Sequence, residues 1–200
     1  MKKCIPVMLL ALLMMTACKN ETTDKLKKAG DNISNVTSII SNAQEVQEES
    51  SKLKELTPLS NDALKAWLPN SLGNLTRSGF KVGKAGYLNV SSIEGTYKND
   101  DGRVLEVEVM DGAGEMGSVL MTSMSMASKM EVEEEDENKH LQTVSKDGVK
   151  AKQTYYKKRN NTELQFIYGQ RFLVMVKAKD MGPDVTWDLV DELDLDDLED

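Results

Sequence analysis

The stretch IEGTYKNDDGRVLEVEV, residues 93–109, decides the fold of this chain. Its centre, NDDG at residues 99–102, is a turn sequence between two runs in which the character of the side chains alternates. After the turn, Leu105, Val107 and Val109 share one face, and the glutamates between them point to the other. A period of two predicts an antiparallel hairpin with one buried and one solvated face.

Turn sequences also divide the last third of the chain into extended runs. Asp147-Gly148, Asn160-Asn161 and Gly169-Gln170 separate four of them. The runs expected to form strands are 141–145, 149–158, 164–168 and 172–176. The last run is almost continuously apolar, which predicts a central strand.

Three segments within residues 58–200 carry helical signals. Residues 60–62 supply caps for a short helix, Pro183 begins a C-terminal helix, and Gly114–Met130 has the pattern of an amphipathic helix. The predicted apolar face of the Gly114–Met130 helix holds Met116, Val119, Leu120, Met124, Met126, Ala127 and Met130. Its polar face holds Ser118, Thr122, Ser125 and Ser128, together with Met121. The sequence therefore predicts an α+β globular domain over residues 58–200, an antiparallel sheet packed against helices on one face.

The N-terminus carries the pattern of an export signal. Two lysines precede an apolar run over residues 5–15, which suits a signal peptide and is too short to span a bilayer. The sequence MTAC at residues 15–18 follows and resembles the bacterial lipobox. That resemblance implies a lipoprotein signal peptide over 1–17 and acylation of Cys18, with palmitate-type chains as the membrane anchor. An ordinary secretory signal is the alternative.

Residues 18–57 are expected to connect the anchor to the domain as a leash and an amphipathic helix. Apolar residues recur at steps of three and four, at Leu26, Ala29, Ile33, Val36, Ile40 and Ala43. This spacing predicts a tether helix that ends before Thr57-Pro58. Packing on the domain, a role as a spacer and self-association as a coiled coil are all compatible with the pattern.

Cysteine content, the residues after Cys18 and the net charge limit the cellular compartment and the classes of partner that we expect. Cys4 lies in the predicted signal and Cys18 in the anchor, so the folded part has no thiol for a disulfide or a metal. Lys19-Asn20-Glu21 lacks the Asp that retains lipoproteins in the inner membrane of enteric bacteria. We therefore expect an outer membrane lipoprotein of the cell envelope, on the periplasmic face or the cell surface. The net charge of −8 argues against a nucleic-acid partner.

No motif for catalysis or for a cofactor stands out. His140 is the only histidine, and no Gly-x-Ser-x-Gly elbow, phosphate-binding loop, dinucleotide fingerprint or zinc motif occurs. We expect a protein that is not an enzyme and that holds no metal or cofactor.

Three clusters of side chains are candidate binding sites. Met116, Leu120, Met124 and Met126 are the candidates to line a ligand cavity, although core packing is the favoured interpretation of this helix and Cu(I) binding is a further alternative. The acidic run 133–137 suits a solvated loop or a Ca²⁺ site. The basic cluster is Lys150, Lys152, Lys157, Lys158 and Arg159. It suits protection of an edge strand or an anionic ligand.

Four stretches, 59–77, 91–111, 169–176 and 193–198, resemble a group of uncharacterised envelope lipoproteins of Bacteroidota and other Gram-negative bacteria. The resemblance covers most of 58–200 and implies no activity. The order of strands and helices is also similar to Mog1/PsbP-like domains, which implies a fold but no function.

The function expected from these features is that of a lipid-anchored, non-enzymatic envelope protein. Its partners would be the membrane, through Cys18, and an envelope protein or another envelope component. The alternative is a carrier of a small apolar or lipid ligand, in a cavity walled by the methionine-rich helix.

Overall fold

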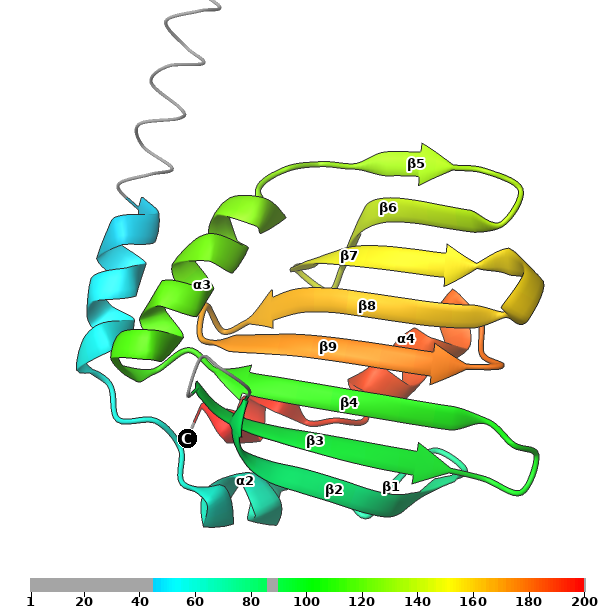
Figure 1. The fold of residues 1–200 in the computed structure, drawn as a ribbon, viewed down its shortest axis with the longest axis horizontal. Coiled ribbons are helices and arrows are strands. Elements are labelled where there is room, and N and C mark those ends of the chain that lie inside the picture. The colour runs from blue at the N-terminus through cyan, green and yellow to red at the C-terminus, as the bar shows by residue number, and fades with distance from the viewer. Residues whose placement is uncertain (1–44, 86–89, 200) are drawn as a thin grey trace, which may run out of the picture. The chain divides into compact units, whose positions relative to one another are not determined.

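Nine strands form one antiparallel sheet in the part of the chain that the computed structural model describes, residues 45–85 and 90–199. The strands are β1 (Ser71–Leu72), β2 (Leu75–Ala85), β3 (Val90–Lys98), β4 (Val104–Asp111), β5 (Glu133–Glu135), β6 (Lys139–Lys146), β7 (Val149–Tyr156), β8 (Asn161–Tyr168) and β9 (Phe172–Lys179). Their order across the sheet is β1-β2-β3-β4-β9-β8-β7-β6-β5 (Figure 1). Two meanders therefore meet at the centre, where β4 pairs with β9.

Helices complete the fold. They are α2 (Asn61–Trp67), α3 (Gly114–Ser128), α4 (Pro183–Asp191), the short 3-10 turns η2 (Lys157–Arg159) and η3 (Leu195–Leu198), and a helix over residues 45–55. The predicted α+β class and the antiparallel sheet are confirmed. The predicted signal peptide, Cys18 and most of the predicted tether lie outside the described residues.

The hairpins form where the turn sequences predicted them. β3 and β4 flank residues 99–102, and Tyr97 lies opposite Leu105. At the β6–β7 hairpin, Asp147 and Gly148 have φ values of 49° and 82°. Positive φ at both central residues is the geometry of the two-residue turn that matches the twist of paired strands.

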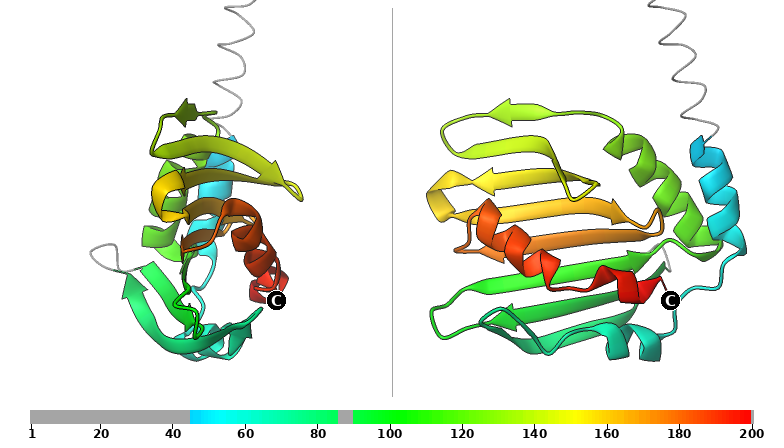
Figure 2. Two further views of the ribbon diagram at one scale, coloured as in Figure 1. Left: turned by 90° about the vertical axis from the view of Figure 1, so that its right-hand side faces the viewer. Right: turned by 180° about the vertical axis from the view of Figure 1, so that it is seen from behind.

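The main core lies on the sheet face that carries α2, α4 and η3 (Figure 2). Leu105, Val107 and Val109 of β4 are fully buried there, as their alternation predicted. α4 is attached by Trp187, whose Nε1 donates a hydrogen bond to Gln153 Oε1 at 2.9 Å and whose ring lies 5.7 Å from that of Phe166.

The opposite sheet face carries a smaller apolar cluster under α3 and the helix over 45–55 (Figure 1). Its buried members are Leu53, Val90, Leu120, Met121 and Leu173. The two helices run antiparallel, because ion pairs join their opposite ends: Lys54 to Glu115 at 3.5 Å and Lys129 to Glu45 at 2.8 Å. Helices thus pack on both faces of the sheet, whereas the sequence predicted one.

The predicted orientation of α3 is wrong. The buried residues of the helix are Gly117, Ser118, Leu120 and Met121, whereas Met116, Val119, Met126 and Met130 are 42%, 55%, 52% and 73% exposed. Gly117 explains the rotation: a Cβ there would lie 2.5 Å from the carbonyl carbon of Gly112. Only a glycine permits this close approach of the two backbones. The contact turns Leu120 and Met121 toward the sheet, leaves Met124 half-buried beside them, and leaves Met116, Met126 and Met130 exposed.

Candidate functional site

A cavity of about 330 Å³ lies beside the C-terminal half of α3 and is also lined by residues of β6, β7, β8 and β9. Its lining consists of Met124, Ala127, Ser128, Met130, Val132, Thr143, Lys150, Ala151, Lys152, Gln165, Phe166, Ile167 and Leu173. Small-molecule pockets usually measure about 300–1,000 Å³ and are mostly apolar with a few polar groups. This cavity has the composition of such a pocket and lies at the small end of the range.

Of the four residues that the sequence proposed to line a ligand cavity, Met124 alone lines this one. Leu120 is buried in the apolar cluster next to Leu173, which also lines the cavity. Met116 and Met126 are not among the lining residues, because the rotation of α3 exposes them. Met130 also lines the cavity, although the sequence placed it only on the apolar face of the helix and not among the candidate ligand-binding residues.

The polar edge of the cavity is a row of three neighbouring strand residues. Thr143 of β6 and Gln165 of β8 both lie opposite Lys152 of β7. Thr143 Oγ1 accepts a hydrogen bond from the backbone N–H of Val132 at 3.0 Å, and Gln165 Nε2 lies 3.3 Å from Met124 Sδ. Lys152 is exposed and has no ion-pair partner among the described residues.

Ion pairs join two glutamates of the acidic run, and the preceding Glu131, to three lysines of the basic cluster. Glu131 pairs with Lys150 at 3.3 Å, Glu135 with Lys157 at 2.7 Å, and Glu137 with Lys158 at 3.7 Å. The hydrogen bond from Lys157 and its charge lower the pKa of the Glu135 carboxyl. Glu133–Glu135 form the edge strand β5, so part of the run predicted as a loop is a strand. These pairings account for three lysines of the basic cluster, whereas Lys152 has no ion pair among the described residues.

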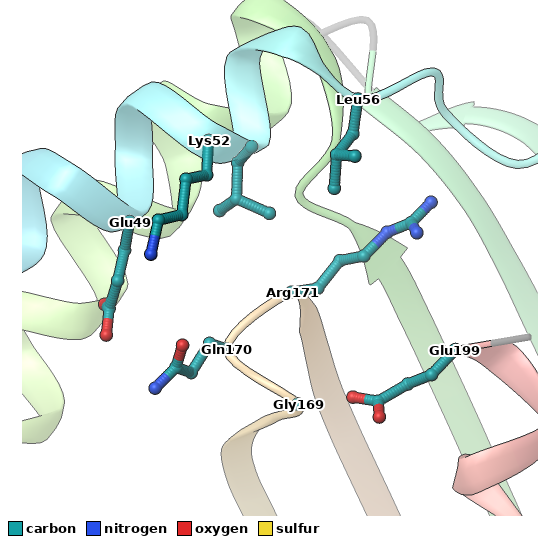
Figure 3. Close-up of a pocket in the computed structure, with 8 residues that line it drawn as sticks. Glu49, Lys52, Leu56, Gly169, Gln170, Arg171 and Glu199 are labelled. Carbon is teal, nitrogen blue, oxygen red and sulfur yellow. The ribbon is translucent and has the colours of Figure 1, made fainter.

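A second, smaller cavity of about 230 Å³ lies between the helix over 45–55 and the β8–β9 turn (Figure 3). It is lined by Glu49, Lys52, Leu53, Leu56, Gly169, Gln170, Arg171 and Glu199. Charges of both signs line it, and Glu199 packs so closely against Gly169 that a Cβ there would lie 1.4 Å from Glu199 Oε1. The space is therefore shaped by contacts within the protein, and we assign it no ligand.

Beside that cavity, Arg171 forms an ion pair with Asp111, which is fully buried. Asp111 Oδ1 accepts from Arg171 Nε at 2.8 Å and from the Ala113 N–H at 2.9 Å. Asp111 Oδ2 accepts from Arg171 Nη2 at 2.9 Å and from the Leu59 N–H at 2.7 Å. The hydrogen bonds to Asp111 raise the pKa of Arg171. With every bond directed within the protein, the pair is a structural connection, which no sequence motif indicated.

His140 does not assemble a catalytic site. Its Nε2 lies 3.8 Å from Glu133 Oε1 and has no hydrogen-bond partner among the described residues. In the same part of the chain, no three His, Cys, Asp or Glu side chains are grouped as metal ligands.

In comparisons with known proteins, the chain matches no protein-family model, no curated protein and no solved structure. The resemblance to envelope lipoproteins and to Mog1/PsbP-like domains therefore stays a prediction. Among the helices in 45–85 and 90–199, none combines the length and the apolar character needed to cross a bilayer.

Proposed function

We propose that this protein is a non-enzymatic, lipid-anchored envelope protein that binds a small apolar or lipid ligand in the cavity beside α3. The observation that carries the proposal is the cavity of about 330 Å³ with its largely apolar lining. Met124, Ile167 and Leu173 contribute apolar side chains from the cluster under α3, and Met130, which is 73% exposed, lines the same cavity.

Methionine suits such a lining because its unbranched, polarisable side chain adapts to ligands of different shape. Apolar side chains at an open cavity are in contact with water, and an apolar ligand that covers them removes this surface from water.

Binding can be tested with the full chain in nanodiscs of deuterated lipid, with ¹³C-labelled methionine methyl groups. Decanol is the uncharged apolar probe, and we expect it to shift the methyl signals of Met124 and Met130. Ala127→Trp places an indole at the cavity and should weaken this binding about tenfold or more, because it occupies the ligand's volume. Ser123→Trp, on an exposed position of the same helix, is the matched control. Unchanged signals in the parent protein would refute the proposal.

The anchor has its own test, based on the lipobox resemblance of residues 15–18. Cys18→Ser removes the sulfur that the lipobox resemblance implies as the acceptor of the diacylglycerol. We expect this variant to lose both its acyl mass and its membrane association. If it is processed and fractionates with membranes as the parent does, Cys18 is not the anchor.

A partner protein of the envelope is the second candidate, favoured by the exposed apolar side chains of α3, which are Met116, Val119, Met126 and Met130. Contiguous exposed apolar side chains often mark a protein interface. A photo-crosslinking amino acid at Val119 in living cells should give one discrete adduct that Met126→Glu abolishes. The same amino acid at Asp100, in the β3–β4 turn, should give none. No adduct, or the same adduct from both positions, would exclude this surface.

A further inference from the structure

We propose that the ligand of the α3 cavity is a single-chain amphiphile with a carboxylate head group, and that Lys152 binds this head group. The inference rests on the proposed function and adds the chemical class of the ligand.

The first argument is the charge of the lining. The chain carries 33 acidic and 25 basic residues, yet no Asp or Glu lines the cavity, whereas Lys150 and Lys152 do. An acidic protein thus presents a locally positive site, which favours an anion over a cation or an uncharged head group.

The second argument is that one of the two lysines that line the cavity has no ion-pair partner among the described residues. Lys150 pairs with Glu131 at 3.3 Å, an exposed and therefore weak ion pair. Lys152 has no ion pair among the described residues, although Lys157 and Lys158 of the same basic cluster have one each. The ammonium group of Lys152 is therefore available to a ligand at the edge of an apolar wall.

The third argument is the pair of donors that flank Lys152. The Thr143 hydroxyl oxygen accepts from Val132 N–H, which leaves its proton free to donate. The Gln165 amide contacts only a weak acceptor, Met124 Sδ at 3.3 Å, among the described residues. Thr143 and Gln165 lie opposite Lys152 on the two neighbouring strands. A carboxylate there can accept from an ammonium, a hydroxyl and an amide while its chain contacts the methionines.

The volume restricts the rest of the ligand. A cavity of about 330 Å³ is near the lower limit for small-molecule pockets. It suits one acyl chain of medium length better than a phospholipid with two.

The test compares decanoate with decanol, which differ in the head group, on the methionine-labelled full chain in nanodiscs. The ratio of the two apparent affinities is measured for the parent, Lys152→Met, Lys152→Arg and Lys177→Met. Lys177 is the matched control, because it lies on β9 on the same sheet face, opposite Glu163, and does not line the cavity. Comparing the ratio among variants in one lipid removes the partitioning of each probe into the bilayer.

We expect the parent and Lys177→Met to bind decanoate about tenfold more tightly than decanol. A charged hydrogen bond at a partly solvated site accounts for a ratio of this size. Lys152→Met should lose this preference without losing decanol binding, and Lys152→Arg should retain it. Equal affinity of the parent for both probes, or a preference that survives in Lys152→Met, overturns the inference and leaves the cavity as a binding site. If neither probe moves the Met124 and Met130 signals, the proposed function fails as well.

Discussion

At the scale of single residues, Asp111 joins three parts of the chain to the end of β4. Its carboxylate accepts from Leu59 before α2, Ala113 before α3 and Arg171 before β9. A buried carboxylate is costly unless its oxygens are paired, and here four donors satisfy both of them. Asp111 therefore holds together segments that sequence distance separates.

We expect Asp111→Ala to lower the free energy of unfolding by about 3–5 kcal/mol, because it leaves the Arg171 guanidinium and two backbone N–H groups without their partner. Urea denaturation followed by circular dichroism measures the change. Asp101→Ala, in the exposed β3–β4 turn, is the control and should change it by less than about 0.5 kcal/mol. Equal effects of the two substitutions would show that the buried ion pair is dispensable.

Tyr97 predicts a dependence of stability on alkaline pH. Its fully buried side chain donates from Oη to the Pro69 carbonyl at 3.0 Å, and burial raises its pKa to about 12. An unfolded tyrosine titrates near pH 10, so above that pH the unfolded state loses a proton that the folded state keeps. The contribution is complete below pH 10 and is lost as the pH rises toward 12. Between pH 9 and pH 12 the parent should lose about 2 kcal/mol more than Tyr97→Phe does. Parallel loss in both proteins, measured by urea denaturation, would contradict this assignment.

At the scale of elements, β5 shows how charge rather than burial holds a strand at the edge of a sheet. All three of its residues are exposed glutamates, and ion pairs to Lys139 and Lys157 fasten it to the neighbouring hairpin. Exposed pairs of this kind contribute about 0–1 kcal/mol each and weaken in salt. β5 should therefore open locally while the rest of the sheet stays folded.

Glu135→Lys tests this at one pair, because it replaces attraction to Lys157 with repulsion. We expect faster hydrogen–deuterium exchange over residues 131–137 and unchanged exchange in β4 and β9. The double substitution Glu135→Lys with Lys157→Glu should restore protection, whereas Asp100→Lys, the same change of charge in a distant turn, should have no effect on β5. Faster exchange throughout the sheet would mean that β5 does not open independently.

At the scale of the whole described molecule, the two meanders share one core and one central ladder. β4 and β9 contribute eight paired positions, from Val104 opposite Lys179 to Asp111 opposite Phe172. The apolar cluster under α2 and α4 draws buried residues from both meanders. Neither half can bury its apolar face without the other, so both should unfold together.

The two tryptophans report on the two halves. Trp67 lies in α2 beside the first meander, and Trp187 in α4 contacts Gln153 and Phe166 of the second. In Trp67→Phe and in Trp187→Phe, the fluorescence of the remaining tryptophan and the circular dichroism should give the same urea midpoint. Separate midpoints within either variant would show that the meanders unfold independently.

The sequence by itself determined the class of fold and the positions of its hairpins, because alternation of side chains and turn chemistry are local properties. Leu105, Val107 and Val109 are buried as their spacing requires, and the turns at 99–102 and 147–148 connect the strands that they predicted.

Only the tertiary structure decided the orientation of α3 and the composition of the cavity. The close approach of Gly117 to Gly112 turns that helix, and the neighbours of Lys152 come from strands that precede and follow it. Hydrophobic periodicity describes which residues share a face, but long-range contacts decide which face turns inward. For this reason the sequence pointed to the helix, while packing selected Met124 and Met130 and excluded Met116 and Met126 from the cavity wall.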